Sequence, residues 1–401
     1  MSATLPLSGV HVLDFSRVLA GPFATMLLAD MGADVLKIES LQGDDTRQWG
    51  PPWFGEGEYR QSAYYLSANR NKRSLALNLK DPDVQAIARD LAAGSQIVVE
   101  NFKPGGMAAF GLDYRSLQQL NPALVYASLT GYGQTGPYSN QPGYDFVIQG
   151  ESGLMSITGP ADGEPYKLGV AISDVVAGLF AATSILGALR LAERTGQGQH
   201  LDIALFDTSI AALVNVVSNA LVSGQRPGRY GNAHPSIVPY QPFVASDRAF
   251  TVAVGNDRQF EALCACIGHP EWATDPRFAT NPARVAHRDE LIARLEPEFR
   301  QRTAGEWVEV LLARGIPSGP INDVLTMLDD PQVAARGLIH ELDLLGDTLR
   351  MIGPAVGFSA TPLSVQSPPP RLGEHTDHVL RERLGMTDAE IGRLRTQRAI
   401  G

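Results

Sequence analysis

The sequence of 401 residues contains only two cysteines, Cys264 and Cys266. Two thiols this close together are too few for a disulfide framework or a zinc site. We therefore expect a protein of a reducing compartment, the cytoplasm, that has no disulfide-stabilised fold.

Basic residues are outnumbered, because 33 lysines and arginines stand against 43 aspartates and glutamates, giving a formal net charge of -10. A general nucleic-acid binder needs a basic surface for phosphate contacts. The N-terminus, MSATLPLSGVHVLDFSR, lacks a basic stretch followed by an apolar one, and no uncharged run approaches the ~18 residues of a membrane span. We expect neither a nucleic-acid nor a membrane partner.

Hydrophobic residues make up 44% of the sequence and charged residues 19%, which is the balance of a globular protein. Residues 9–39 predict a strand, VHVLDFS, a helix from Pro22 to Met31, and a second strand, DVLKIE. This βαβ pattern is typical of a Rossmann-type sheet. The turn SRVLAGP has no G-x-G-x-x-G fingerprint, so a bound dinucleotide is not expected.

Two later strands end in loops that suit a ligand. QIVVE runs directly into NFKPGG, and LVYASLTGY is followed by a Gly/Pro-rich loop that ends at Tyr144 and Asp145. Ligands of open α/β sheets bind outside the carboxyl ends of the strands. Asn101, Phe102 and Lys103 are therefore well placed for binding.

Asp174 follows an extended segment, and apolar residues repeat at helical spacing after it. This pattern predicts a helix that begins at Asp174. A helix N-terminus favours negative charge, so we expect a lowered pKa and an ionised carboxylate, as a carboxylate nucleophile requires. The alternative is that Ser173 or Asp174 is an ordinary N-cap.

The C-terminal sequence GEHTDH contains four candidate metal ligands, Glu374, His375, Asp377 and His378. Their spacing does not place a full ligand set on one helix face, and no second cluster completes it. We expect no metal and interpret Thr376 as the N-cap of the last helical segment. A G-x-S-x-G elbow is also missing.

Nine segments in chain order resemble the class III CoA-transferase family, which includes the α-methylacyl-CoA racemases. The segments are LDFSRVLAGPFATMLLADMGADVLKIE, GDDTRQWGPP, NRNKRSLALNLKDP, VVENFKPGG, LTGYGQTGP, PGYD, SDVVAG, GNAHPSIVPYQPF and VAVGNDRQF. The resemblance as a whole extends from about Leu7 through LGEHTDHVL. The resemblance implies that Asp174 attacks an acyl-CoA thioester to form a mixed anhydride, and then carries CoA as an aspartyl-CoA thioester. It implies CoA and acyl-CoA as substrates and no permanently bound cofactor.

The resemblance also implies a set of CoA-holding residues. These are Arg17, Ala20, Leu77, Asn78, Leu79, Lys80, Asn101, Phe102, Lys103, Tyr144 and Asp145. Lys80 and Lys103 suit phosphate, and Phe102 suits adenine or pantetheine. Ser40 and Ala109 stand where some family members have a basic residue, so other groups must grip the phosphates.

The implied fold is α/β, with a Rossmann-like large domain built from both chain ends, a smaller α+β domain, and an interlocked homodimer. A composition break near Gln225 and a return of strand-like alternation at Leu349 fit this division. We expect residues 1–224 and 331–401 in the large domain and residues 225–330 in the small one.

Within the family, GDDTRQWGPP, NRNKRS and AHPSIVPYQ most resemble the branch that moves CoA from a donor such as succinyl-CoA to a dicarboxylate such as glutarate. Arg47 is the candidate for the second carboxylate, with an interface salt bridge as the alternative. His234 and Tyr240 are the other candidate substrate residues.

A racemase is the first alternative function, disfavoured because Tyr144 replaces a histidine base. A non-catalytic CoA-binding protein is the second.

Overall fold

The structure is a computed structural model that describes residues 4–57, 60–344 and 346–401. The chain forms two compact units. Unit 1 comprises Met1–Leu154, Leu168–Gly224 and Ala334–Gly401, and unit 2 comprises Met155–Lys167 and Gln225–Val333. The break at residue 225 lies where the composition changes. The expected division differs in two segments, because residues 155–167 and 331–333 belong to unit 2 although the sequence placed them in the large domain.

Unit 1 is built on a six-stranded sheet whose strand order is β5-β2-β1-β6-β7-β8 and whose pairs are all parallel. The strands are β1 (His11–Asp14), β2 (Asp34–Glu39), β5 (Lys72–Ala76), β6 (Ile97–Glu100), β7 (Val125–Thr130) and β8 (Gln199–Ala204). Strands buried on both faces are rich in Val, Ile and Leu, as β6 and β7 are. The strand order reverses between β1 and β6, which is where an open α/β sheet binds its ligand.

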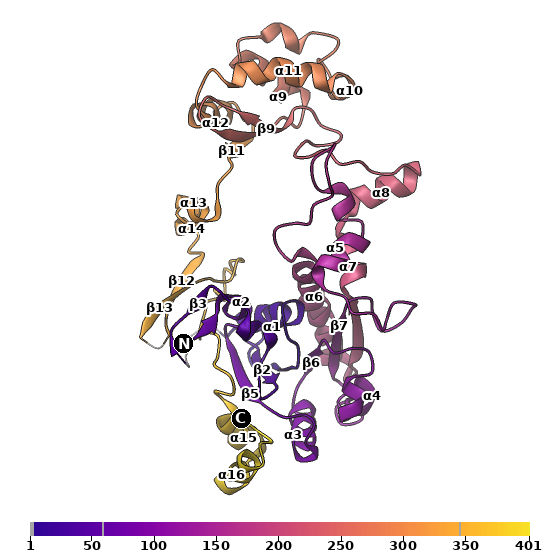
Figure 1. Ribbon diagram of the computed structural model, residues 1–401, viewed down its shortest axis with the longest axis vertical. Helices are drawn as coiled ribbons and strands as arrows, with labels where there is room; N and C mark the ends of the chain where they lie inside the picture. The colour runs from indigo at the N-terminus through magenta and orange to yellow at the C-terminus, as the bar shows by residue number, and fades with distance from the viewer. Residues whose placement is uncertain (1–3, 58–59, 345) are drawn as a thin grey trace. The chain divides into compact units, whose positions relative to one another are not determined.

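Helices cover both faces of this sheet (Figure 1). On one face, α1 (Ala20–Asp30) and α6 (Ile172–Thr195) share a core with β1, β2, β6, β7 and β8. On the other face, α3 (Pro82–Ala93), α15 (Thr376–Leu384) and α16 (Asp388–Thr396) form a second core. Leu77 forms an antiparallel bridge with Ile400, so both ends of the chain build unit 1.

The remaining elements of unit 1 lie in the connections. They are η1 (Asp45–Gln48), β3 (Trp53–Phe54), β4 (Gln61–Ser62), α2 (Ala63–Ser67), η3 (Met107–Phe110), α4 (Tyr114–Leu117), α5 (Asp145–Glu151), α7 (Leu205–Ala212), α8 (Val214–Ser223), β12 (Ile339–Leu344) and β13 (Asp347–Ile352). The short helix α14 (Pro331–Ala335) spans the boundary of the two units.

Unit 2 has a small antiparallel sheet of order β11-β10-β9. Its elements are η4 (Met155–Ile157), β9 (Tyr240–Val244), β10 (Ala249–Ala253), α9 (Asp257–Cys266), η5 (Pro270–Ala273), α10 (Asn281–Ala286), α11 (Arg288–Phe299), α12 (Ala304–Leu312), β11 (Ser318–Pro320) and α13 (Val324–Leu328). Trp272, Phe278 and Trp307 are all buried in its core. Helices and an antiparallel sheet make this unit α+β.

By length and composition, α6 would be able to cross a membrane. The sequence predicted no such segment. In the structure, the buried residues of α6, among them Ala177, Ala181 and Ile185, belong to the core beneath the parallel sheet.

Candidate active site

The loop after β1 is held in place by two polar side chains. The Asn101 side chain accepts a hydrogen bond from the Arg17 amide at 3.0 Å and donates one to the Arg17 carbonyl at 2.7 Å. Val18 has a φ of 70°, which is unusual for a β-branched residue, and its amide bonds to the buried Asp44 carboxylate at 3.2 Å. Asn101 therefore joins the β1 and β6 loops, a role that the sequence does not reveal.

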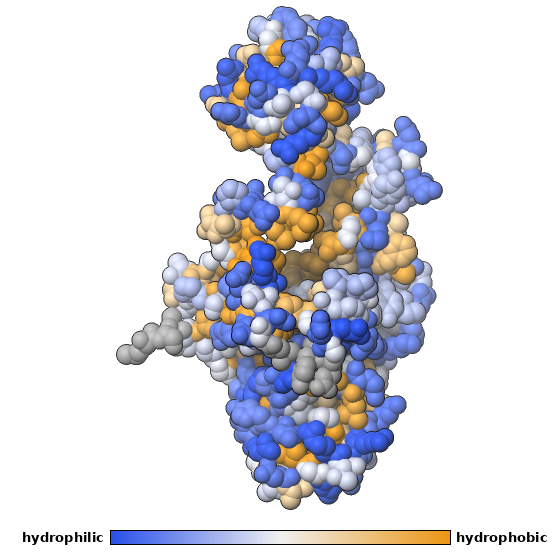
Figure 2. All heavy atoms as spheres, turned by 60° about the vertical axis from the view of Figure 1, so that its left-hand side comes forward, coloured by the Kyte–Doolittle hydropathy of each residue, from blue (hydrophilic) through white to orange (hydrophobic). Residues whose placement is uncertain are grey.

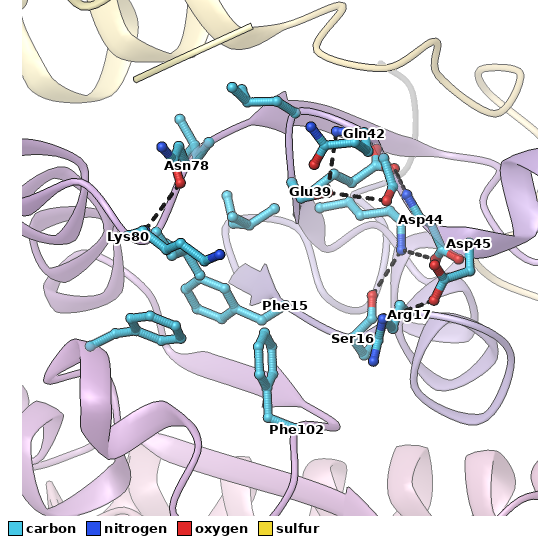
Figure 3. A pocket seen from close by; sticks show the side chains of 18 residues that line it. Phe15, Ser16, Arg17, Glu39, Gln42, Asp44, Asp45, Asn78, Lys80 and Phe102 are labelled. Atoms are coloured by element: carbon cyan, nitrogen blue, oxygen red, sulfur yellow. Dashed lines mark hydrogen bonds and ion pairs between the residues drawn. The ribbon is translucent and has the colours of Figure 1, made fainter. Parts of the chain in front are cut away.

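A pocket of about 640 Å³ opens beside this loop. Leu77, Asn78, Leu79 and Lys80, all expected at the CoA site, line it together with Arg17, Phe102 and Ser40. Figure 3 shows the Phe102 ring and the Lys80 side chain pointing into the hollow from opposite loops. The pocket therefore combines a cation with an aromatic face, which suits a nucleotide.

A second pocket, of about 160 Å³, contains Asp174. Arg17 and Phe102 line both pockets, so the two hollows are neighbours. The predicted residues Ala20, Asn101, Lys103 and Tyr144 also line the Asp174 pocket. The structure thus brings ten of the predicted residues to two adjoining pockets around one aspartate.

Asp174 is the third residue of α6, because the helix begins at Ile172 and not at Asp174. The Ala20 backbone amide, at the start of α1, faces the carboxylate as a donor and lowers its pKa. A close approach of α6 to α1 allows this contact. A Cβ atom on Gly178 would lie 2.8 Å from the Ala20 carbonyl oxygen and 2.9 Å from the Phe23 ring, so only glycine fits there without movement.

The expected lowered pKa of Asp174 is wrong. Burial, followed by the negative charge of Asp145, raises the pKa of Asp174 to about 7, against the smaller opposing effect of the Ala20 amide. The loss of hydration therefore raises the pKa of Asp174 by more than the helix N-terminus lowers it. The carboxyl group is therefore about half ionised near neutral pH and mostly ionised above it.

Asp145 does not line either pocket. Its Oδ1 atom accepts a hydrogen bond from the Ser173 amide at 2.8 Å, and its Oδ2 atom accepts one from Gln149 Nε2 at 2.8 Å. Gln149, which is fully buried, also accepts from the Leu168 amide at 2.9 Å. The Asp145 carboxylate therefore satisfies the first turn of α6, and its role in holding CoA stays a prediction.

Sequence reasoning missed an aromatic pair near Asp174. Tyr64, on α2, lies close enough to Asp174 and Asp145 that their charges, added to burial, raise its pKa. Its ring meets Trp49 edge to face at 5.1 Å between centroids. Both residues belong to the loop rich in aromatics that follows β2, and that richness is the only signal the sequence offers.

Tyr144 comes directly after Gly143, whose backbone lies close to that of Gly131. A Cβ on Gly143 would lie 2.7 Å from the Gly131 Cα, and the same distance applies in reverse. The residue that meets Gly143 is Gly131, at the start of the same Gly/Pro-rich loop. Tyr144 itself is 64% exposed in the single chain.

Arg47 occupies a different place from the one expected. Its guanidinium donates to both carboxylate oxygens of Glu39, at 2.8 and 2.7 Å, to the Tyr65 hydroxyl at 2.6 Å and to the Pro370 carbonyl at 3.1 Å. It also stacks on the Tyr65 ring. Arg47 does not line the Asp174 pocket. The side chain therefore forms an internal ion pair, and its role as a clamp for a substrate carboxylate stays a prediction.

His234 and Tyr240 lie in unit 2 and contact each other. Their ring centroids are 5.3 Å apart, and the His234 amide donates to the Tyr240 carbonyl at 3.0 Å. At the C-terminus, α15 begins at Thr376 with His375 as its N-cap, so Thr376 is not the cap. Among the described residues, no group of three or more His, Cys, Asp or Glu side chains is placed to hold a metal ion.

A sequence model of "CoA-transferase family III" matches residues 7–376. The chain belongs to this family. It is 47% identical over 381 residues to the succinate–glutarate CoA-transferase of Agrobacterium fabrum, covering 94% of this chain and 95% of the relative. It is 43% identical over 397 residues to the human succinyl-CoA:glutarate CoA-transferase, covering 98% and 90%. The crystal structure of a CAIB/BAIF family protein from Brucella suis matches with a TM-score of 0.85 and 44% identity, over 95% of this chain and all of that one.

The family and these relatives make the protein a CoA-transferase, an enzyme whose substrates are CoA thioesters and carboxylic acids. The fold agrees, because the mixed α/β architecture with a central parallel sheet is shared with the Brucella suis structure.

Proposed function

We propose that this family III enzyme transfers CoA from succinyl-CoA to a dicarboxylate such as glutarate, with Asp174 as the nucleophile. The observation that carries the proposal is a partly buried aspartate at the start of α6, in a pocket that shares two lining residues, Arg17 and Phe102, with a nucleotide-sized hollow. The named activities of the relatives from Agrobacterium fabrum and human support the donor and the acceptor.

CoA would lie across both pockets. Lys80 would meet a phosphate in the larger hollow, where Phe102 offers a ring to adenine or pantetheine. Lys103 and Arg17 line the route to Asp174, although Arg17 is paired with Asp45 at 2.8 Å in the free protein. In this proposal these cations substitute for the basic residues that some family members have at the positions of Ser40 and Ala109.

In the proposed mechanism, Asp174 attacks the thioester carbonyl, and the C–S bond breaks to release CoA thiolate and leave an aspartyl-acyl anhydride. The thiolate then attacks the aspartyl carbonyl, which gives aspartyl-CoA and releases the first acid. The acceptor carboxylate attacks the aspartyl carbonyl and expels the CoA thiolate, which leaves a second anhydride. The thiolate then attacks the acceptor's acyl carbonyl, which forms the product acyl-CoA and frees the Asp174 carboxylate. The Ala20 amide, which bonds to Asp174, is placed to keep its attacking oxygen in line.

Both anhydrides react with water, so the pocket must close during turnover. The exposed Tyr144 and the Gly131–Gly143 contact before it are the proposed cover. Because Arg47 is engaged by Glu39, the acceptor's second carboxylate is left to other groups. His234 and Tyr240 stay as candidates for this role.

The large unit is proposed to be Rossmann-like, because its strands, numbered in chain order, lie in the order 3-2-1-4-5-6. An interlocked homodimer is supported by apolar side chains left open on the single chain, of which Figure 2 shows several on one face. Val214, Leu221 and Val222 of α8 and Phe146 of α5 are each more than 60% exposed. Such exposure is typical of an interface. Light scattering at micromolar concentration should give twice the chain mass.

The decisive experiment traps the intermediate. After incubation with succinyl-CoA and hydroxylamine, mass spectrometry should find a hydroxamate at Asp174. The Asp174→Ala variant should give no label and no CoA transfer, while CoA still binds. Labelled acids offered as acceptors define the substrate class. Substantial turnover by Asp174→Ala, or deuterium uptake at the α-carbon of a 2-methylacyl-CoA in heavy water, would rule the proposal out and favour racemase chemistry.

A further inference from the structure

Glu100 is a buried carboxyl group that contacts the CoA-binding turn directly. It is the last residue of β6, and Asn101, Phe102 and Lys103 follow it. Glu100 is 5% exposed, and its Oε2 atom accepts a hydrogen bond from the Phe102 amide at 2.7 Å. Because Phe102 lines both pockets, this single bond fixes the turn on which the proposed CoA site depends.

Two further side chains continue from Glu100 across the sheet. The strand register pairs Glu100 with Ser128 on β7 and pairs Tyr126 with His200 on β8, so these side chains share one face of the sheet. Ser128 acts on Glu100 as a hydrogen-bond donor that lowers the pKa of the carboxyl group, and its hydroxyl lies 2.9 Å from His200 Nε2. The His200 ring stacks on Tyr114 at 5.6 Å between centroids, which fixes its orientation.

The hydroxyl proton of Ser128 can serve only one neighbour at a time. When Glu100 is neutral, its O–H donates to Ser128 and Ser128 donates to His200. When Glu100 is ionised, Ser128 donates to the carboxylate and accepts from His200 Nε2–H. The protonation of Glu100 is therefore linked to the state of the His200 ring through one serine.

The surroundings of this chain of hydrogen bonds hold charges of both signs. A hollow of about 410 Å³ is lined by Glu100, Ser128 and His200, and by these other titratable groups: Lys103, Asp113, Tyr114, Arg115 and Tyr126. Burial lowers the pKa of His200, and the negative charge of Asp202, on β8, opposes this effect. Burial is the largest influence on Glu100 and raises its pKa to about 7, while the bonds from Ser128 and Phe102 oppose this.

We propose that Glu100 is a positioning residue for the CoA-binding turn, and that its ionisation, linked through Ser128 to His200, makes the affinity for CoA depend on pH. A hydrogen bond to an ionised acceptor is stronger than one to a neutral acceptor. The Phe102 amide is therefore held more firmly when Glu100 is charged. The inference rests on the proposed placement of CoA at residues 101–103.

The test measures the Kd of free CoA for the wild-type enzyme by calorimetry from pH 6 to pH 8, without any acyl donor, so that no turnover occurs. The Kd should fall roughly fivefold as the pH rises through neutrality, the factor expected from the stronger bond. Glu100→Gln should hold the weak value throughout this range. Dephospho-CoA is the matched ligand, because a phosphate monoester also titrates near pH ~6.

Two variants that keep Glu100 should move the midpoint in opposite directions. Ser128→Ala removes a donor to the carboxylate, so the midpoint should rise. His200→Phe keeps the ring stacking but frees the serine proton for Glu100, so the midpoint should fall. Glu193→Gln, at the exposed far end of α6, is the control and should leave the curve unchanged.

A wild-type Kd that does not vary with pH, a Glu100→Gln variant that keeps the wild-type curve, or midpoints that move together in the two flanking variants would overturn the inference. None of these results touches the proposed function. That proposal fails separately, if wild-type enzyme binds CoA at neither pH or forms no adduct at Asp174.

Discussion

Arg47 and Glu39 form a two-pronged ion pair, with N–O distances of 2.8 and 2.7 Å, in which the Glu39 side chain is 1% exposed and the Arg47 side chain 10%. This pair joins the loop after β2 to the strand itself. Removing one partner of a buried pair leaves the other charge without compensation. A substitution of Arg47 is therefore expected to act first on the stability of the fold.

Arg47→Ala should lower the free energy of unfolding by about 3 to 5 kcal/mol, as measured by denaturant titration. Because its guanidinium is engaged internally, transfer to a dicarboxylic and to a monocarboxylic acceptor of equal length should fall by the same factor. Arg350→Ala is the control, since its pair with Glu341 is mostly exposed and worth less than about 1 kcal/mol. A loss confined to the dicarboxylate would return Arg47 to the substrate site.

Gly178→Ala should reduce turnover strongly without removing Asp174. The new methyl group meets the Ala20 carbonyl at 2.8 Å, so α6 and α1 must separate and the Ala20–Asp174 bond lengthens. A displacement of the order of 1 Å can cost about a hundredfold in rate. Gly187→Ala, in the same helix with nothing within 4 Å of the added atom, is the matched control. It should keep full activity and gain up to about 1 kcal/mol of stability.

The sequence predicts features that depend on local pattern. Alternating and apolar runs define the strands, the carboxyl ends of parallel strands must meet at one edge, and so Asn101 to Lys103 reach the pocket. It does not predict contacts between distant segments. The partners of Arg47 include Pro370, 323 positions away. The raised pKa of Asp174 comes from burial and from Asp145, neither of which a helix N-terminus reveals.

Rate measurements against pH should reveal the raised pKa of Asp174. Single-turnover formation of the Asp174 hydroxamate should increase through a midpoint near pH 7, because only the carboxylate attacks. Asp145→Asn removes the negative charge beside it, so the midpoint should move to lower pH. Glu193→Gln removes a charge about 28 Å along the same helix and should not move it. Equal midpoints in Asp145→Asn and wild type would show that burial alone sets the pKa.

The same raised pKa predicts that the nucleophile destabilises the fold. Asp174 has a pKa of about 7 in the folded chain, above its ordinary value of 3.8, so the folded state binds its proton more tightly than the unfolded state does. The free energy of unfolding therefore falls as the pH rises between these two values, and the penalty is complete above neutrality. Asp174→Asn lacks the charge at every pH. At pH 8 it should be more stable than the wild type by up to about 4 kcal/mol, from roughly three pKa units at 1.36 kcal/mol each. Near pH 4 the two should have similar stability.

Denaturant titrations at both pH values check this, with a circular dichroism spectrum to verify that the variant keeps its fold. A variant that is less stable at pH 8 would mean that the Ala20 amide stabilises the carboxylate more than burial destabilises it.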